Sequence, residues 1–257
     1  IFWEIGCEVI TINNNPNGKN INDNCGAVNI KELSKKVLYT KADIGFAFDG
    51  DGDRIIAVDE KGFEVDGDKL IALFAKELLK SKKLNKKTVA TTVMSNLGFE
   101  IFLIDNLGVK LIRKNVGDIN VITEMKKKNL NLGGEQSGHI ILGQYMSTGD
   151  GILAALKITE FLSSQNIKAS KMFDLYTNYP QIKNNIRIDK KISNKTDNLI
   201  NALYLSYKKE YKELRFLIRK SGTEPILRVL VEGKKEEMVN KISFKLVKNK
   251  KKILNEK

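Results

Sequence analysis

The chain has 257 residues, of which 42% are hydrophobic, and it carries a formal net charge of +13. This length is enough for one large domain or for two to three small ones with a sizeable core. No apolar run reaches the ~18 residues that a membrane span requires, so we expect no membrane partner. The charge suggests nucleic-acid binding, but few aromatic residues interleave with the lysines, so we expect no nucleic-acid partner.

The cysteines and the start of the chain concern its origin. Cys7 and Cys25 have no Cys-x-x-Cys spacing and the sequence shows no secretory-signal pattern, which indicates a reduced, cytoplasmic protein. Residues 1–5 are typical of the last turn of an amphipathic helix, and Gly6 is typical of the glycine that follows one. We therefore expect the sequence to be a truncated part of a longer chain.

Strands and helices alternate along the first 175 residues. We predict strands at 8–13, 44–48, 55–59, 88–93, 110–113 and 140–142, with 62–65 completing a hairpin. We predict helices at 30–39, 67–81, 97–107, 118–127 and 150–163, from apolar residues at helical spacing. This alternation favours mixed, largely parallel α/β domains.

The pattern changes after a predicted boundary at 176–180. Strands are predicted at 181–188, 215–220 and 226–232, and helices at 196–209 and 236–248, with a turn at 221–225. The fold class is therefore α/β, with a small α+β C-terminal domain built on an antiparallel sheet.

The most distinctive stretch is Asp49-Gly50-Asp51-Gly52-Asp53-Arg54, between two predicted strands. Carboxylates are hard oxygen donors that suit Mg²⁺ or Ca²⁺. Gly50 and Gly52 allow positive φ, so the loop can curl until the three Asp side chains converge, and such crowding is costly without a cation. Arg54 suits a phosphate or carboxylate beside the metal. The predicted metal ligands are Asp49, Asp51 and Asp53.

Two other interpretations of this loop are possible: an EF-hand and a turn that binds no metal. Asp49, Asp51, Asp53 and Glu60 match positions 1, 3, 5 and 12 of an EF-hand loop. Position 6, where the sharp turn needs glycine, is Arg54, and the flanking runs resemble buried strands and not helices. We therefore favour a strand–loop–strand metal site, with an Asp/Gly-rich turn that binds no metal as the alternative.

A second motif, Gly133-Gly134-Glu135-Gln136-Ser137-Gly138-His139, joins a loop to a strand. Glu135 and Ser137 lie two residues apart, so in an extended stretch they point the same way and suit adjacent sugar hydroxyls. No Gly-Lys-Ser/Thr ends the motif, so it is not a Walker loop. His139 is the only histidine, and taken alone it is more typical of a surface or core histidine than of a catalytic one.

A third motif, Arg219-Lys220-Ser221-Gly222-Thr223-Glu224-Pro225, lies between two predicted strands. Its hydroxyls, an amide and two guanidinium groups could surround one phosphate. The alternative is a hairpin turn with an ordinary polar surface, and the concentration of donors favours the anion site. The predicted phosphate ligands are Arg219, Ser221, Gly222, Thr223 and Arg228.

These three motifs, in this order along one chain, resemble the α-D-phosphohexomutase superfamily. Shorter motifs at 94–98, 116–118 and 148–151, together with Gln136, are similar to those of its bacterial phosphoglucosamine mutase branch. The resemblance covers essentially the whole chain. It implies three parts: the end of the family's second domain with the metal loop at 1–63, the sugar-binding third domain at 64–175, and the phosphate-binding fourth domain at 181–257.

The resemblance implies an activity for the complete enzyme. Such an enzyme interconverts glucosamine 6-phosphate and glucosamine 1-phosphate through a phosphoserine and a 1,6-bisphosphate, with Mg²⁺ as cofactor. It implies catalytic roles for Arg54 and His139, sugar contacts from Glu135 and Ser137, and a phosphate held by the third motif. The expected partner is a phosphorylated hexosamine, and a homodimer is left open.

Some features depart from the family's pattern. Its phosphoryl-carrying serine loop is not found, so we expect this chain alone to be inactive. Ile119 stands where the branch usually has Arg, and Lys114 where it usually has Thr. Two alternatives remain open: a phosphomannomutase/phosphoglucomutase, and a non-catalytic fragment that binds sugar phosphates.

Overall fold

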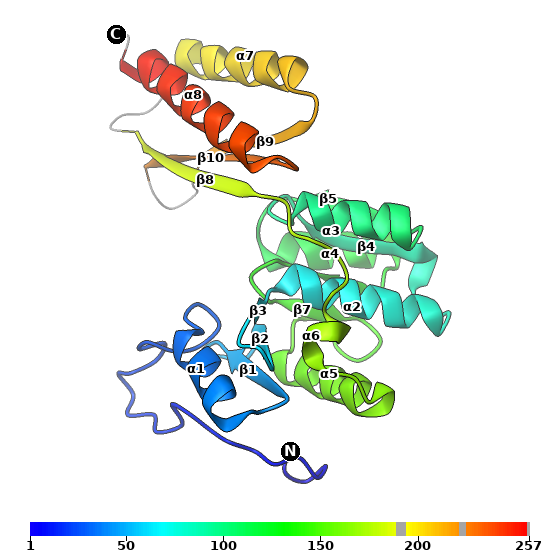
Figure 1. Cartoon of the computed structure of the whole chain (residues 1–257). Coiled ribbons are helices and arrows are strands. Elements are labelled where there is room, and N and C mark those ends of the chain that lie inside the picture. The colour runs from blue at the N-terminus through cyan, green and yellow to red at the C-terminus, as the bar shows by residue number, and fades with distance from the viewer. Residues whose placement is uncertain (189–193, 221–224, 256–257) are drawn as a thin grey trace. The chain divides into compact units, whose positions relative to one another are not determined.

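A computed structural model describes residues 1–188, 194–220 and 225–255 of the chain (Figure 1). It shows two compact units: Ile1–Ser95 with Phe99–Thr177, and Asn96–Gly98 with Asn178–Lys257. The predicted mixed α/β class is confirmed, since helices accompany both parallel and antiparallel strand pairs. Within the described ranges, no helix combines the length and the apolarity needed to cross a bilayer.

The first sheet of unit 1 carries the acidic loop. Strands β1 (Ile44–Phe48), β2 (Ile55–Asp59) and β3 (Glu64–Val65) pair antiparallel in the order β1-β2-β3. Helix α1 (Lys31–Thr40) packs closely on β1, because a Cβ on Gly45 would lie only 2.6 Å from the Val37 side chain. All of β2 is buried, so the acidic loop leads into a strand that is packed on every side.

The second sheet of unit 1 has the order β5-β4-β6-β7. The central strand β4 (Thr88–Thr92) runs parallel to β5 (Lys110–Lys114) and β6 (Leu132–Gly134), and β7 (Ile140–Leu142) runs antiparallel to β6. Parallel pairing is confined to these strands among the described residues. The unit also contains α2 (Gly67–Lys80), η1 (Asn85–Lys87), η2 (Phe102–Asn106), α4 (Asp118–Lys128), α5 (Gly151–Gln165) and α6 (Ala169–Met172). Helix α3 (Leu97–Ile101) begins in the residues assigned to unit 2 and ends in those of unit 1.

A large apolar core holds this unit together, and a smaller apolar cluster around Ala90, Val121 and Met125 belongs to the same unit. Helix α2 contributes most to the large core, because its apolar residues recur at helical spacing and are fully buried from Leu70 to Ala75. The Asp66 side chain caps the helix by accepting a hydrogen bond from the Lys69 amide, 3.1 Å away. The largest buried members of this core are Ile55, Leu70, Ile71, Leu73, Phe74, Phe99, Leu103, Leu132, Ile140 and Ile158.

Unit 2 is the predicted small α+β domain. Strands β8 (Gln181–Arg187), β10 (Ile226–Gly233) and β9 (Leu214–Lys220) form an antiparallel sheet in the order β8-β10-β9. Helices α7 (Asn194–Glu210) and α8 (Glu236–Asn255) lie on one side of it (Figure 1). Alternating buried residues of the strands face these helices and make the core.

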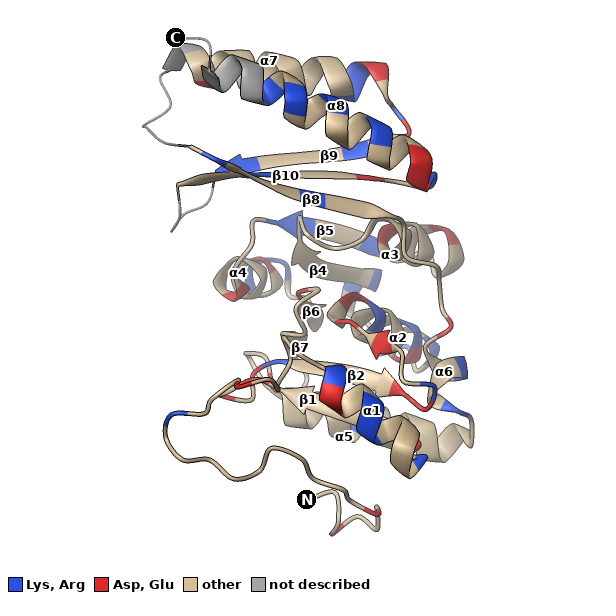
Figure 2. Ribbon diagram, turned by 60° about the vertical axis from the view of Figure 1, so that its left-hand side comes forward, with Lys and Arg blue, Asp and Glu red and all other residues tan. Residues whose placement is uncertain are grey.

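Positive charge is concentrated in unit 2. Residues 178–257 hold 21 Lys or Arg against 9 Asp or Glu, which is a net +12 of the chain's +13. Figure 2 shows Lys and Arg on α8 and β9 of this unit. The unit that holds the acidic loop is therefore almost neutral, and the unit that holds the predicted phosphate motif is strongly basic.

Some predicted elements were wrong or missed. Residues 8–13 form no strand, and Val9 and Ile10 are exposed, because no described strand pairs with them. Strand β6 was missed because glycine is typical of loops. Gly133 stands there because a Cβ would lie 2.8 Å from the Ala90 carbonyl oxygen and 2.5 Å from the Met125 sulfur.

The remaining differences from the predicted elements concern two helices and one turn. The helix predicted at 97–107 is α-helical only over Leu97–Ile101 and continues as a π-helical turn over Phe102–Asn106. The short helix α6 was not predicted. Most of the turn predicted at 221–225 falls outside the described residues.

Candidate functional site

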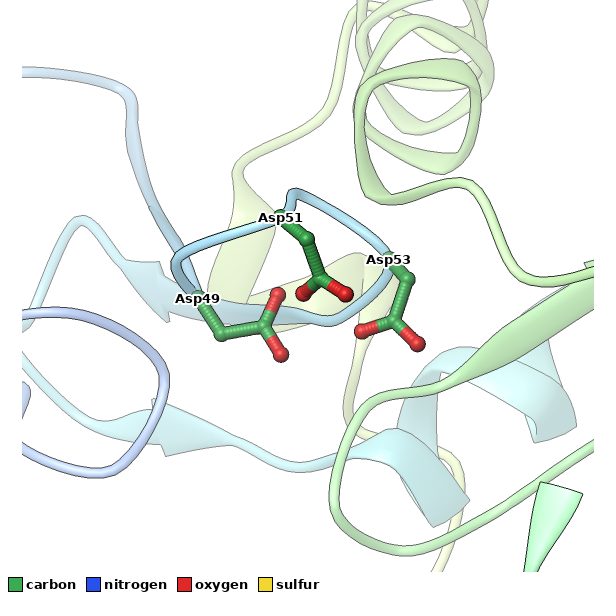
Figure 3. Close-up of side chains that lie close together, drawn as sticks. All are labelled: Asp49, Asp51 and Asp53. Atoms are coloured by element: carbon green, nitrogen blue, oxygen red, sulfur yellow. The ribbon is translucent and has the colours of Figure 1, made fainter.

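The acidic loop brings its three carboxylates to one point. Phe48 and Ile55 are directly paired at the ends of β1 and β2, so the loop between them is a closed turn. One carboxylate oxygen from each of Asp49, Asp51 and Asp53 lies within 4.8 Å of the other two. Figure 3 shows the three side chains converging from this single loop.

The two loop glycines act differently from the prediction. Only Gly52 adopts a positive φ, of 74°, and its amide donates to the Asp49 carbonyl to close the turn. Gly50 has no positive φ, and a Cβ there would lie 2.3 Å from the Ile21 side chain. The curl of the loop thus depends on Gly52, whereas the group nearest to Gly50 is the end of an exposed side chain that can move aside.

The donor set suits a hard divalent cation. Burial, and then the neighbouring Asp49, raise the pKa of the Asp53 carboxyl, because a carboxylate that is removed from water and lies beside another carboxylate is less stable when charged. A cation among the three oxygens would relieve that crowding, and carboxylate oxygens are the ligands that Mg²⁺ and Ca²⁺ prefer. The residues present therefore fit a hard divalent cation, such as Mg²⁺ or Ca²⁺.

Arg54 closes the loop and faces its acids. Its amide donates to Asp49 Oδ1 at 3.0 Å, and its Nε lies 3.7 Å from Asp49 Oδ2 and 3.9 Å from Asp53 Oδ1. These ion pairs are long and the side chain is 42% exposed. The guanidinium group can therefore turn to an anionic ligand at little cost.

The second motif is joined to the acidic loop through the backbone. The Ile55 amide donates to the Gly138 carbonyl at 3.0 Å, and Arg54 and His139 form an isolated β-bridge. A Cβ on Gly138 would lie 2.2 Å from the Ile55 carbonyl oxygen, so only glycine permits this approach. Two of the three predicted constellations thus meet within unit 1.

His139 is buried against the metal loop. Its side chain is 1% exposed, and Nε2 lies 3.4 Å from Asp53 Oδ2. Within the described part of the chain, neither ring nitrogen has a hydrogen-bond partner that meets the geometric limits. His139 is therefore a core histidine, one of the two placements that the sequence predicted, and its ring lies beside a predicted metal ligand.

Glu135 and Ser137 do not lie on an extended stretch. The Gly138 amide donates to the Glu135 carbonyl at 3.0 Å, which makes the segment a turn, so the two-residue alternation does not apply. The Glu135 carboxylate is buried and accepts from the Gly117 amide at 3.1 Å, whereas Ser137 is exposed. Their shared role as readers of sugar hydroxyls stays a prediction.

The two arginines of the third motif are direct cross-strand neighbours. Arg219 on β9 pairs with Arg228 on β10 in the antiparallel register. Burial, and then the charge of Arg228, lower the pKa of the Arg219 guanidinium group. Two cations held side by side indicate an anion site. The other predicted ligands, Ser221, Gly222 and Thr223, lie outside the described residues.

The two departures from the family pattern have different surroundings. Lys114 Nζ lies 3.2 Å from Glu124 Oε2, and Lys128 Nζ lies 3.4 Å from Glu124 Oε1. Lys114 is therefore engaged by a largely buried carboxylate of its own unit. Ile119, by contrast, is exposed at the start of α4.

The sequence-based reasoning missed the contacts of two backbone segments. Gly117 contributes its amide to Glu135, and the segment 148–151 contacts both the acidic loop and His139. In the sequence, both segments stand out only as motifs of the resembling family. They contribute backbone atoms and empty space, which no pattern of reactive side chains reveals.

Family models match most of the chain. The alpha/beta/alpha domain II model of phosphoglucomutase/phosphomannomutase matches residues 2–62, and the corresponding domain III model matches 66–179. The C-terminal domain model of the same family matches residues 206–248. The three matches occur in the order of the domains.

Curated relatives are similar over almost the whole chain. A phosphoglucosamine mutase of Nautilia profundicola is 49% identical over 246 residues, which are 96% of this chain and 55% of that protein. A phosphoglucosamine mutase of Bartonella henselae is 43% identical, covering 96% of this chain and 53% of that protein. The chain thus spans about half the length of the curated relatives that it matches.

Solved structures share the fold. A phosphoglucomutase/phosphomannomutase family protein of Burkholderia thailandensis aligns with a TM-score of 0.72 at 22% identity, over 88% of this chain and 50% of that one. The N-acetylphosphoglucosamine mutase of Aspergillus fumigatus, solved with GlcNAc-6P and magnesium, aligns with a TM-score of 0.67 at 19% identity. That alignment covers 88% of this chain and 52% of the other.

Proposed function

We propose, from the premise that this chain belongs to the phosphoglucomutase/phosphomannomutase family, that it supplies the metal-, sugar- and phosphate-binding parts of a phosphoglucosamine mutase. The complete protein would interconvert glucosamine 6-phosphate and glucosamine 1-phosphate through a phosphoserine and a 1,6-bisphosphate. The observation that carries this proposal is the meeting of the acidic loop with His139 in one unit.

The metal site supplies electrophilic chemistry. Asp49, Asp51 and Asp53 would hold Mg²⁺, which acts as a Lewis acid toward a phosphoryl oxygen when bound. Phosphoryl transfer depends mainly on positioning and on charge neutralisation, so the chain has little covalent work to do.

Arg54 and His139 are the proposed catalytic residues. The exposed guanidinium group of Arg54 neutralises charge on the transferring phosphoryl group from beside the carboxylates. The Nε2 side of the His139 ring faces Asp53, at 3.4 Å from its Oδ2. The burial of that ring favours a hydrogen-bonding role over proton exchange with solvent.

The sugar is read by the turn that follows β6. Ser137 offers an exposed hydroxyl group, and one carboxylate oxygen of Glu135 is held by the Gly117 amide while the other is left for a sugar hydroxyl. The turn is anchored to α2, because the Gly67 amide donates to the Gln136 carbonyl at 3.0 Å. A fixed turn positions the sugar with little loss of entropy on binding.

The phosphate that does not react binds to unit 2. Arg219 and Arg228, together with Ser221, Gly222 and Thr223, are the proposed ligands. The side-by-side arginines and the net +12 of residues 178–257 support this assignment, because both favour an anion.

The proposal also covers the substrate, the cellular location, the oligomeric state and the activity of the isolated chain. The substrate partner is a phosphorylated hexosamine, and the location is cytoplasmic, without nucleic-acid or membrane partners. A homodimer stays a prediction, which sedimentation of the purified chain would test. We also propose that this chain alone shows no turnover, because the family's phosphoryl-carrying serine loop is not found in its sequence.

A chimera tests the function. The Nautilia profundicola relative would carry this chain in place of its own matching half, and its unaltered form is the control. We expect turnover of glucosamine 6-phosphate, and a kcat/KM that exceeds those for mannose and glucose phosphates. A chimera that is folded by circular dichroism but inactive on all of these sugars would refute the proposal. Preference for mannose or glucose phosphate would assign the chain to the other branch.

A further inference from the structure

We propose that Gly149 and Gly151 are positioning residues. They lie on either side of Asp150, which caps α5. Gly149 fixes the position of the His139 ring, and Gly151 fixes the position of the acidic loop. This inference rests on the proposed function for its link to Mg²⁺. The contacts that carry it are independent of that function.

Gly151 lies against the backbone of the acidic loop. Its amide donates to the Gly52 carbonyl at 2.9 Å. A Cβ at this position would lie 2.7 Å from the Arg54 carbonyl oxygen and 2.9 Å from that of Gly52. Backbone atoms cannot rotate away as a flexible side chain can, so any larger residue would displace the loop.

Gly149 lies against the imidazole. A Cβ there would lie 2.5 Å from both Cδ2 and Nε2 of His139. The same Nε2 faces Asp53 Oδ2 at 3.4 Å. A methyl group at position 149 would therefore push the ring on the side from which it contacts the third carboxylate of the loop.

Neither glycine is required by its own backbone. Both lack the positive φ that favours glycine elsewhere in the described chain. Within a helix, alanine is intrinsically a better residue than glycine, and Gly151 is the first residue of α5. The surrounding structure therefore requires that these two positions carry no side chain. This requirement comes from the two loops that the glycines contact.

The segment that carries the two glycines is itself held firmly. Asp150 caps α5, because its side chain accepts from the Leu153 amide at 2.9 Å, and its own amide donates to the Ile140 carbonyl at 3.3 Å. Helix α5 packs on β1, β2 and β7, the strands that border both loops. A firmly capped helix end is a suitable seat for a site that needs fixed geometry.

The consequence concerns cation affinity. The carboxylates of Asp49, Asp51 and Asp53 converge only while the loop keeps its shape. Mutation of residues that support metal ligands typically lowers metal affinity by about 10- to 100-fold. We therefore expect Gly151→Ala to weaken cation binding about 10- to 100-fold. We expect Gly149→Ala to move the imidazole even without a cation.

The single histidine makes the test direct. Proton NMR of the 257-residue chain gives one set of imidazole signals, because His139 is the only histidine. Mn²⁺, which takes the same hard oxygen ligands as Mg²⁺, would broaden those signals when it binds beside Asp53. The variants are Gly149→Ala and Gly151→Ala. The control is Gly108→Ala, which strains the backbone at φ 63° but has no heavy atom within 4 Å of its added Cβ.

Each outcome is decisive. We expect Gly149→Ala to shift the metal-free imidazole signals, and Gly151→Ala to need about 10- to 100-fold more Mn²⁺ for half-maximal broadening, with Gly108→Ala unchanged in both. If both alanine variants matched Gly108→Ala, the inference would be overturned. If the parent chain bound no Mn²⁺, the metal proposal would fail, while the metal-free shift of Gly149→Ala would still decide the seat of His139.

Discussion

Nε2 of His139 lies 3.4 Å from a carboxylate oxygen of Asp53, and the histidine side chain is 1% exposed. One buried imidazole therefore joins the third carboxylate of the acidic loop to the turn at residues 135–139. The backbone bridge between Arg54 and His139 reinforces this link. The predicted metal site and the predicted sugar-reading turn are consequently parts of one rigid assembly.

Replacing this histidine should impair the metal site of that assembly. In the chimeric enzyme, we expect His139→Gln to lower kcat at least about 10-fold, because Asp53 loses a neighbour that fixes its side chain. The KM for the sugar phosphate should change little. Steady-state kinetics at several Mg²⁺ concentrations would measure both effects, with Lys35→Ala on exposed α1 as the control. A higher KM at unchanged kcat would contradict the assignment.

Removing one charge from the acidic loop should have opposite effects on stability and on binding. We expect Asp51→Asn to weaken Mg²⁺ binding at least about 10-fold, because one hard ligand is lost. Without metal, the same change should stabilise the chain by about 1 kcal/mol or less, because crowding is relieved. Calorimetric titration and urea unfolding would measure these quantities. Loss of stability together with unchanged Mg²⁺ affinity would exclude a metal role for Asp51.

The arginine pair should distinguish charge from geometry. We expect Arg219→Lys to weaken phosphate binding about 10-fold, because an ammonium group cannot form the two parallel hydrogen bonds of a guanidinium group. Titration with inorganic phosphate and with glucosamine 6-phosphate at two salt concentrations would measure this. The control Lys212→Ala removes an exposed charge from the same unit and should alter only the salt dependence. Equal affinities for Arg219→Lys and the parent would remove Arg219 from the site.

A buried ion pair should stabilise unit 2. Glu232 is 0% exposed, and its Oε2 lies 2.6 Å from Arg215 Nε. Truncating Glu232→Ala leaves a largely buried guanidinium group without that carboxylate, so we expect the free energy of unfolding to fall by about 3 to 5 kcal/mol. Urea denaturation would measure it, with exposed Glu213→Ala as the control. A loss below about 1 kcal/mol, the range of an exposed pair, would show that the pair is solvated.

Glu60 should make stability depend on pH. Burial alone would raise the pKa of its carboxyl, but hydrogen bonds from the hydroxyl and the amide of Ser170 outweigh it and lower the pKa. A lowered folded-state pKa means that the stabilisation is present above the unfolded value of 4.5 and is lost as pH falls through the folded value. We expect Glu60→Gln to cost about 1 to 2 kcal/mol at pH 7 and much less in acid. A difference independent of pH would contradict this.

Local patterns were sufficient for much of the fold. Helix α1, strands β1 and β2, helix α2 and the elements of unit 2 follow from apolar spacing, because periodic burial is written in neighbouring residues. The spacing of Asp49, Asp51 and Asp53 likewise predicted converging carboxylates, since the three residues fall within five consecutive positions of one loop. These predictions needed no knowledge of what the segments pack against.

Other features depended on partners that are distant along the chain. Residues 8–13 alternate like a strand but have no described strand beside them, and a ladder cannot form without its second half. Gly133 is typical of a loop, and only the approach of Ala90 and Met125 accounts for its place in β6. The burial of His139, and the empty space that Gly149 and Gly151 leave for it and for the acidic loop, arise from contacts across many residues. The amino-acid sequence by itself determines which groups can react. Only the tertiary structure determines which of these groups lie close together, because that depends on contacts between distant residues.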